Sequence, residues 1–232
     1  MKKRIWELDA LRGICVLGMV IVHLFYDLRV FADLMQDIPD WFYYLGRYGH
    51  IFFILISGIC VTLGRSSDKR GIYVLGAALL VSYATFFAEF ALHMGTIRIW
   101  FGILHLLGVC MLLYPLFKKL PHWLLAMFGL AIVALGFWMQ GLTVEFDFLF
   151  PLGLRSQNVF VGSDYFPLFP NLGWFLIGAA LGKSLYKKRQ TLLPNCNENF
   201  GLFRFFRFCG VHSLEIYLIH QPILTGLVML FA

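Results

Sequence analysis

The chain has 232 residues, of which 60% are hydrophobic and only 14% are charged. A water-soluble domain of this length does not need so much apolar surface, and the excess lies in runs long enough to cross a bilayer. Soluble enzymes and soluble binding modules are therefore excluded. The net charge of +6 does not indicate nucleic-acid binding, because the basic residues alternate with apolar runs and form no single patch.

Seven apolar segments are predicted to cross the membrane as helices, which makes the fold class an all-α integral membrane protein with one domain over residues 1–232. The segments lie at about 5–28, 49–65, 71–92, 99–117, 121–140, 168–186 and 212–231. Between the fifth and sixth, residues 141–167 are rich in aromatic residues and proline and are expected to lie as a cap in the interface. Between the last two, Phe203-Arg-Phe-Phe-Arg-Phe208 predicts a segment on the membrane surface.

The basic residues predict the orientation of these segments. With a cytoplasmic N-terminus, fourteen lysines and arginines fall on the inner side and only four on the outer side. The four outer ones are Arg29, Arg47, Arg98 and Arg155. Because loops on the cytoplasmic side carry the excess of Lys and Arg, the N-terminus is predicted inside and the C-terminus outside.

The first segment carries four ionisable residues on one face: Asp9, Arg12, His23 and Asp27. At 100° per residue they fall within about 60° of one another. Ionisable groups inside a bilayer are costly and usually face a bundle interior or an aqueous cavity, so the stripe predicts a polar track through the membrane. The alternative is a helix end at which Arg12 reaches the interface and His23 makes only structural hydrogen bonds.

Three histidines lie well inside the predicted spans: His23, His105 and His220. Histidine exchanges protons near neutral pH, and His23 with Asp27 has the i, i+4 spacing of a base and a carboxylate that orients it. Each of the three could instead only donate a hydrogen bond between helices. The five cysteines show neither CxxC nor another metal-ligand spacing, and we expect neither a disulfide framework nor a metal site.

Several motifs along the chain resemble the bacterial membrane family related to the catalytic domain of heparan-alpha-glucosaminide N-acetyltransferase. They are Arg4-x-x-Glu-Leu-Asp-Ala-Leu-Arg-Gly13, His23-x-x-x-Asp27, Gly102-Ile-Leu-His105, Asp164-Tyr-Phe-Pro-Leu-Phe-Pro170 and His212-Ser-Leu-Glu-Ile-Tyr-Leu-Ile-His-Gln-Pro222. Arg12 and His23, with ten residues between them, also match the Arg-x10-His pattern of the acyltransferase-three membrane proteins. The matches run from the first predicted helix to the last.

The resemblance implies an acyltransferase that moves an acetyl or short acyl group from cytoplasmic acetyl-CoA to a sugar or cell-envelope acceptor at the outer side. The implied setting is the bacterial cytoplasmic membrane, with the lipid bilayer, acyl-CoA and the acceptor as partners, no nucleic acid, and the oligomeric state left open. A base must deprotonate the acceptor and donors must stabilise the oxyanion, and an arginine suits an anionic donor. The candidate catalytic residues are His23, Asp27, His105 and His220. The candidates for binding acetyl-CoA are Arg12 and Asp9, and those for binding the acceptor are Arg98, Asp164, His50 and Glu215.

Another class of function fits the same stripe. A small-solute or proton-coupled transporter would also line its path with ionisable residues, although the sequence shows no internal repeat of the kind that many transporters carry. A structural membrane subunit would use these residues only to hold helices together. Binding of acyl-CoA separates the acyltransferase from both.

Overall fold

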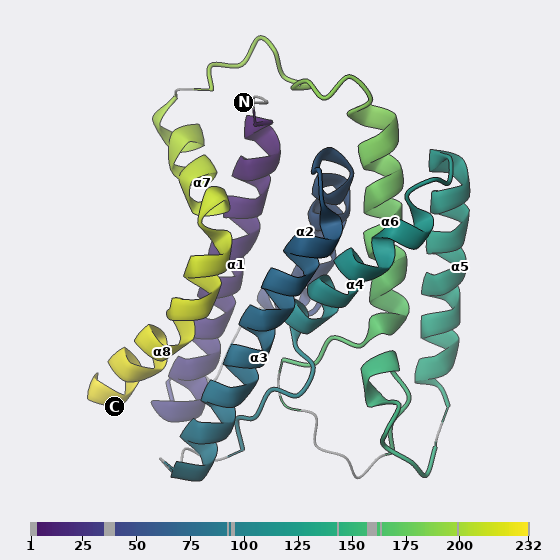
Figure 1. Cartoon of the computed structure of the whole chain (residues 1–232). Coiled ribbons are helices and arrows are strands. Elements are labelled where there is room, and N and C mark those ends of the chain that lie inside the picture. The colour runs from purple at the N-terminus through teal and green to yellow at the C-terminus, as the bar shows by residue number, and fades with distance from the viewer. Residues whose placement is uncertain are drawn as a thin grey trace. The chain divides into compact units, whose positions relative to one another are not determined.

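The computed structural model describes residues 4–34, 40–91, 93, 96–142, 144–156, 162, 164–198 and 200–231. Over these residues the chain forms helices and no β-strand (Figure 1). The helices are α1 (Trp6–Phe31), α2 (Asp40–Leu63), α3 (Ser67–Ala91), α4 (Ile103–Phe117), α5 (His122–Gln140), the short η1 (Phe150–Leu152), α6 (Leu168–Leu185), α7 (Gly201–Val211) and α8 (Ser213–Phe231). The prediction of an all-α protein is confirmed.

Each of the seven predicted spans corresponds to one of these helices, α1 to α6 and α8. Five of them, α1, α2, α3, α5 and α8, are long and apolar enough to cross a bilayer. The 15 residues of α4 cover only about 22 Å at 1.5 Å per residue, less than the roughly 30 Å hydrocarbon core. In α6 the first turn is interrupted at Phe169, whose backbone is extended. The chain is thus a multi-pass membrane protein, while the count of seven spans stays a prediction.

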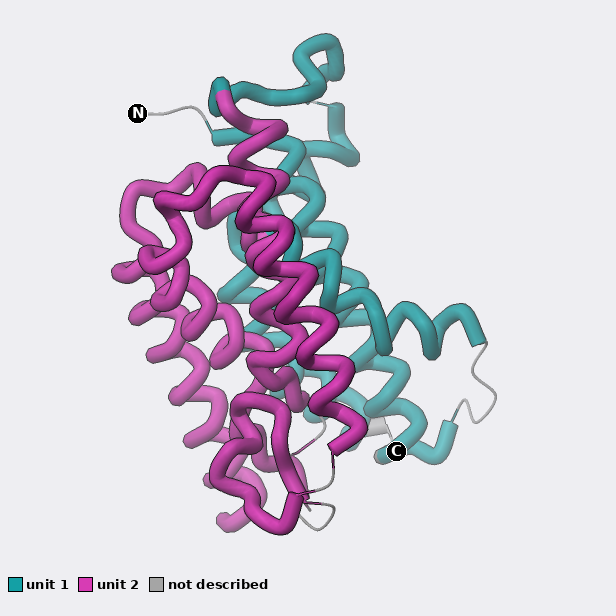
Figure 2. The backbone as a smooth tube through the Cα atoms, turned by 90° about the vertical axis from the view of Figure 1, so that its right-hand side faces the viewer, with its two compact units in different colours: residues 1–56, 188–232 teal, residues 57–187 magenta. Residues whose placement is uncertain are grey.

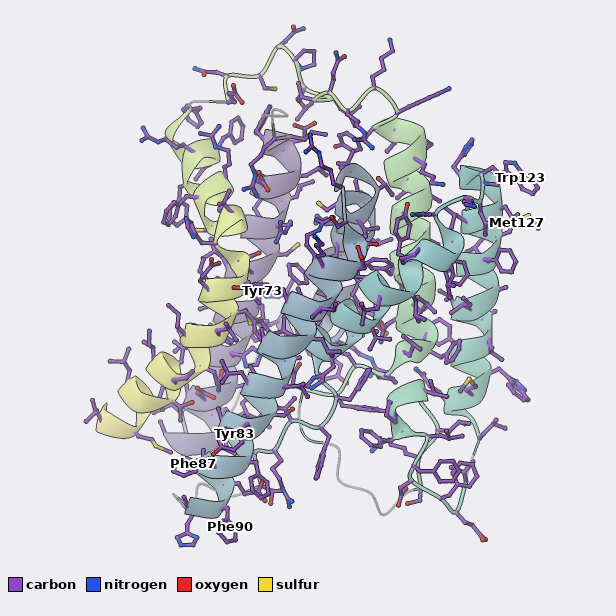
Figure 3. The ribbon with its side chains drawn as sticks, viewed as in Figure 1. Tyr73, Tyr83, Phe87, Phe90, Trp123 and Met127 are labelled. Atoms are coloured by element: carbon purple, nitrogen blue, oxygen red, sulfur yellow. The ribbon has the colours of Figure 1, made fainter. Side chains whose placement is uncertain are left out.

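Large aromatic side chains on α3 are exposed in the part of the chain that the structure describes. Tyr73, Tyr83, Phe87 and Phe90 are between 53% and 75% exposed, and Figure 3 shows them along the helix. They fall within about 100° of one another around the helix axis, so they form one stripe. A stripe of exposed aromatic residues on a helix this apolar is what lipid contact requires.

The chain divides into two compact units, coloured separately in Figure 2. Unit 1 comprises residues 1–56 and 188–232, and unit 2 comprises residues 57–187, so the boundary lies within α2. Unit 1 therefore joins the beginning of the chain to its end. The expectation of a single domain over residues 1–232 stays a prediction.

In unit 1, α7 and then α8 run alongside α1 in the same direction (Figure 1). The ring of Trp6 lies 5.3 Å from that of Phe203 near the start of both helices. Further along, a Cβ at Gly13 would collide with the backbone carbonyl of Phe206, and a Cβ at Gly210 with that of Asp9. Glycine at these two positions lets the helix backbones touch, as small residues do between membrane helices.

The segment that was expected on the membrane surface is therefore a helix packed on α1. Phe203 of α7 lies against Trp6, and Gly210, seven residues later, lies against Asp9 and Gly13, so α7 follows the direction of α1. Cys209 and Gly210 are buried, whereas Phe205 and Phe208 remain exposed. Part of this helix therefore packs on α1, and its location at the membrane surface stays a prediction.

In unit 2, close helix contacts also rest on glycine. A Cβ at Gly58 of α2 would meet the carbonyl of Phe175 in α6, and Gly129 of α5 faces Gly173 of α6. Between α3 and α4, a Cβ at Gly71 would come within 3.0 Å of the carbonyl oxygen of Gly108. These contacts hold α3 against α4, and α6 against both α5 and the end of α2.

Candidate functional site

A cluster of polar side chains lies between α1 and α8 in unit 1. His23 of α1 and His220 of α8 meet edge to face, with ring centroids 5.0 Å apart and an interplanar angle of 85°. One turn further along α1, Asp27 is completely buried. Because His23 and Asp27 are separated by four residues, they share one face of α1, and this face receives α8.

Asp27 is held by α8. Its carboxylate accepts hydrogen bonds from Nε2 of Gln221, at 2.9 and 3.1 Å to the two oxygens, and from Oγ1 of Thr225 at 3.0 Å. The hydrogen bond expected between His23 and Asp27 is not among those that the described residues form. Asp27 therefore orients α8 rather than the His23 ring in this structure, and its catalytic role stays a prediction.

The tautomer of His220 follows from its hydrogen bond. Its Nδ1 lies 2.7 Å from the carbonyl oxygen of Tyr217, and a carbonyl can only accept, so Nδ1 carries the proton. In the neutral ring Nε2 then holds a free lone pair. This atom is buried and has no hydrogen-bond partner among the described residues. A buried imidazole nitrogen oriented by a backbone carbonyl, with its lone pair unused, has the geometry of a general base.

At the other end of α1, Asp9 is paired with two arginines. Asp9 accepts hydrogen bonds from Nε and Nη2 of Arg4, at 2.9 and 3.1 Å. Arg12 donates to the hydroxyl of Ser213 at the start of α8, at 2.7 Å, and its Nη1 lies 3.9 Å from Asp9. The side chain of Arg12 is 26% exposed. Since a guanidinium has five N–H donors, Arg12 keeps donors for an anion while Asp9 fixes its position.

Next to these residues, Glu7 fixes the chain that precedes α7. Its buried carboxylate accepts hydrogen bonds from the hydroxyl of Thr191 and the backbone N–H of Leu192, both at 2.8 Å. Sequence reasoning gave Glu7 no role beyond its place in a motif. The long connection 187–200 is thus tied to the first turn of α1, next to Asp9.

In unit 2, both ring nitrogens of His105 have hydrogen-bond partners. Its Nδ1 accepts the backbone N–H of Gly102 at 3.2 Å, so the proton of the neutral ring is on Nε2. This Nε2 lies 3.3 Å from the hydroxyl of Ser82, which itself donates to the carbonyl of Ile99 at 2.6 Å. His105 therefore closes the first turn of α4, and neither nitrogen has a free lone pair for catalysis.

The extended segment before α4, residues 96–102, is fastened to α3. Ser82 and Thr85 hold the carbonyl and the N–H of Ile99, and Glu89 accepts from both the backbone N–H and Nε of Arg98. These three α3 residues follow one another at helical spacing and form one polar face. Irregular backbone at membrane depth needs such partners, and this face supplies them. Arg98, expected to bind the acceptor, is engaged here by Glu89.

The other predicted acceptor-binding residues have different surroundings within their units. The buried carboxylate of Asp164 lies so close to Gly102 that no Cβ would fit there, and it thereby occupies the N-terminal end of α4, where a negative charge is favourable. His50 lies half-buried in α2. Glu215 lies in the first turn of α8, 65% exposed and 3.9 Å from His212. The assignment of these residues to acceptor binding stays a prediction.

Within each unit, the structure brings some of the predicted residues together. His23, Asp27 and His220 meet in unit 1, as do Arg12 and Asp9 at the other end of α1, while Arg98, His105 and Asp164 lie around the start of α4 in unit 2. Gln221, Thr225 and Tyr217 were missed. The i, i+4 spacing of Gln221 and Thr225 next to His220 is the one signal in the sequence that could have indicated two of them.

The described residues contain no group of three or more His, Cys, Asp or Glu side chains arranged to hold a metal ion. Comparison with known families gives a match over residues 4–222 to the model described as heparan-alpha-glucosaminide N-acetyltransferase, catalytic. No curated protein and no solved structure matches the chain significantly. The match covers every helix up to the middle of α8 and includes His23, Asp27, His220 and Gln221, whereas Thr225 lies beyond its end. The chain thus belongs to the family of the heparan-alpha-glucosaminide N-acetyltransferase catalytic domain, and its function is of the membrane acetyltransferase type.

Proposed function

We propose that this protein transfers an acetyl group from cytoplasmic acetyl-CoA to an amine or hydroxyl of a sugar or other cell-envelope acceptor, at the outer side of the bacterial cytoplasmic membrane. The observation that carries the proposal is the buried, unpartnered Nε2 of His220 beside His23, on a helix pair at membrane depth. The family supports the reaction type, and the charge distribution of the sequence supports the direction.

His220 is the proposed general base. The carbonyl of Tyr217 keeps the proton on Nδ1, so that Nε2 accepts the proton of the acceptor. The imidazolium formed in this way lies against His23 and within the same α1–α8 contact as the Asp27 carboxylate.

Arg12 is the proposed contact for the anionic part of the donor. Its guanidinium is partly exposed, is braced by Ser213 and Asp9, and retains free N–H donors, so it fits a phosphate. Acetyl-CoA supplies the acetyl thioester. Arg12 and His23 lie eleven residues apart on α1, roughly 16 Å along the axis at 1.5 Å per residue. A phosphate bound at Arg12 would therefore lie about this far along α1 from His23, beside which the proposed base His220 lies.

The atoms of the proposed reaction balance without any further reactant. The acceptor oxygen or nitrogen forms a bond to the acetyl carbonyl carbon while its O–H or N–H bond breaks and the proton goes to Nε2 of His220. The C–S bond breaks and CoA leaves as a thiolate. The proton passes from His220 to this thiolate or to solvent, which restores the neutral ring.

The test is turnover by the purified protein in detergent, with acetyl-CoA and glucosamine, measured as free CoA and acetylated product. We expect His220→Gln and His23→Gln to reduce turnover about a hundredfold or more. His212→Gln is the matched control, because this histidine caps α7 and is 46% exposed. A folded wild-type protein that releases no CoA above the protein-free rate would refute the function. Unchanged turnover in His220→Gln would refute the role of the base.

A further inference from the structure

The amide of Gln221 faces Asp27 with its nitrogen. Nε2 of Gln221 donates to both oxygens of Asp27, at 2.9 and 3.1 Å. The same Nε2 lies 3.3 Å from Oγ1 of Thr225, whose hydrogen is already donated to Asp27. Turning the amide over would place two acceptors against each other. The Oε1 atom of Gln221 is therefore directed away from Asp27.

This Oε1 is buried and has no hydrogen-bond partner in the part of the chain that the structure describes. Nε2 of His220, at the preceding position of α8, is in the same state, and the His220 side chain is only 7% exposed. Buried acceptors without partners are rare and costly, and they call for a donor. Both side chains contact the same face of α1, His220 at His23 and Gln221 at Asp27. Consecutive residues of α8 thus carry two hydrogen-bond acceptors without a donor among the described residues, both in the contact between α1 and α8.

We propose that Gln221 is a specificity-determining residue whose Oε1 accepts a hydrogen bond from a second donor group of the acyl acceptor, next to the group that loses its proton to His220. The site then selects acceptors with donors on adjacent carbon atoms, such as a vicinal amino alcohol or diol, over acceptors with a single amine or hydroxyl. The inference rests on the proposed function, because it assigns the acceptor to the same α1–α8 cluster.

Two small probes that differ by one hydroxyl test the inference: trans-2-aminocyclohexanol and cyclohexylamine. We expect the wild-type protein to bind the amino alcohol at least about tenfold more tightly, the worth of one hydrogen bond to a buried acceptor. In Gln221→Met this preference disappears, because a thioether accepts hydrogen bonds poorly. Thr225→Val is the matched control: it also removes a donor from Asp27 but leaves Oε1 in place, and it keeps the preference.

Binding is measured calorimetrically in detergent without acetyl-CoA, and transfer is measured separately with it. No preference in the wild-type protein, the same preference in Gln221→Met, or an equal loss in Thr225→Val each overturns the inference. If Gln221→Met does not fold, Gln221→Asn replaces it, since the shorter amide cannot both reach Asp27 and keep its oxygen in place. A binding preference as expected without any acetyl transfer refutes the proposed function but still shows that Gln221 recognises the second donor group of the ligand. Transfer without a preference does the reverse.

Discussion

The contact between α1 and α7 allows a sharp test, because two glycines carry it. In Gly210→Ala the new methyl group would collide with the backbone carbonyl of Asp9 and lie 2.9 Å from the backbone nitrogen of Gly13. In Gly13→Ala it would collide with the carbonyl of Phe206. Backbone atoms cannot turn aside as a flexible side chain does, so the two helices must move apart.

The expected cost is worked from two opposing effects. Overpacking of a close contact costs about 1–3 kcal/mol, and the upper half of this range applies where only backbone atoms are available to yield. Replacing glycine by alanine in a helix returns about 1 kcal/mol. Each variant is therefore expected to lose about 1–2 kcal/mol of stability. The double variant should lose less than the sum, because one separation of the helices accommodates both methyl groups.

The matched controls lie on the same two helices. A Cβ at Gly18 of α1 or at Gly201 of α7 meets no atom within 4 Å. Gly18→Ala and Gly201→Ala should therefore be neutral or slightly stabilising. Thermal unfolding in detergent, followed by tryptophan fluorescence, measures all five variants. Gly210→Ala and Gly13→Ala melting at the same temperature as their controls would show that α7 does not pack on α1 as described, and full additivity would contradict the shared separation.

Three further outcomes are expected. Asp27→Leu leaves two buried donors of α8 without an acceptor and should cost about 1–3 kcal/mol for each, whereas Asp27→Asn, which keeps one acceptor oxygen, should cost less; equal melting temperatures would contradict this. Ser82→Ala removes the donor to the carbonyl of Ile99, so amides of segment 96–102 should exchange hydrogen faster while those in the middle of α5 do not change. Cys196 is exposed in the connection before α7, and a membrane-impermeant maleimide should label it in inverted vesicles and not in intact spheroplasts; the opposite result would reverse the predicted orientation.

The positions of the apolar helices were predictable, since a long hydrophobic run has few alternatives in a membrane protein. The start of α2 was not. The structure begins it at Asp40, nine residues before the predicted span, through tyrosines and Arg47 that lower the mean hydropathy. Arg47 donates to the hydroxyl of Tyr43 at 2.9 Å and lies over the rings of Tyr43 and Tyr48, so the helix satisfies this charge on its own surface. Average hydropathy cannot register such a local partner.

The sequence predicted which residues belong to the candidate site better than it predicted the hydrogen bonds that they form. Spacing along one helix placed His23 and Asp27 on the same face, which the structure retains. It could not reveal that the partner of Asp27 is Gln221, 194 residues further along the chain. Nor could it show that α4 starts at Ile103, so that His105 falls in the first turn and is used as a cap. Periodicity shows on which face of a helix a residue lies. Only the tertiary structure shows which residue of another element lies opposite to it.

The union of the chain's beginning and end in unit 1 has a consequence for biosynthesis. Asp27 emerges from the ribosome early, but Gln221 and Thr225 are added 194 and 198 residues later. At about 5–20 residues per second, the carboxylate waits roughly 10–40 s before its partners exist. Over that interval the Asp27 side chain of the nascent α1 lacks its partners from α8, whether α1 lies in the lipid or in the insertion machinery. Residues 57–187 can meanwhile complete their own packing, so the α1–α8 cluster is assembled last. A chain that stops before α8 would keep most of its apolar helices and still leave Asp27 without its bonds, as a ready signal for membrane quality control.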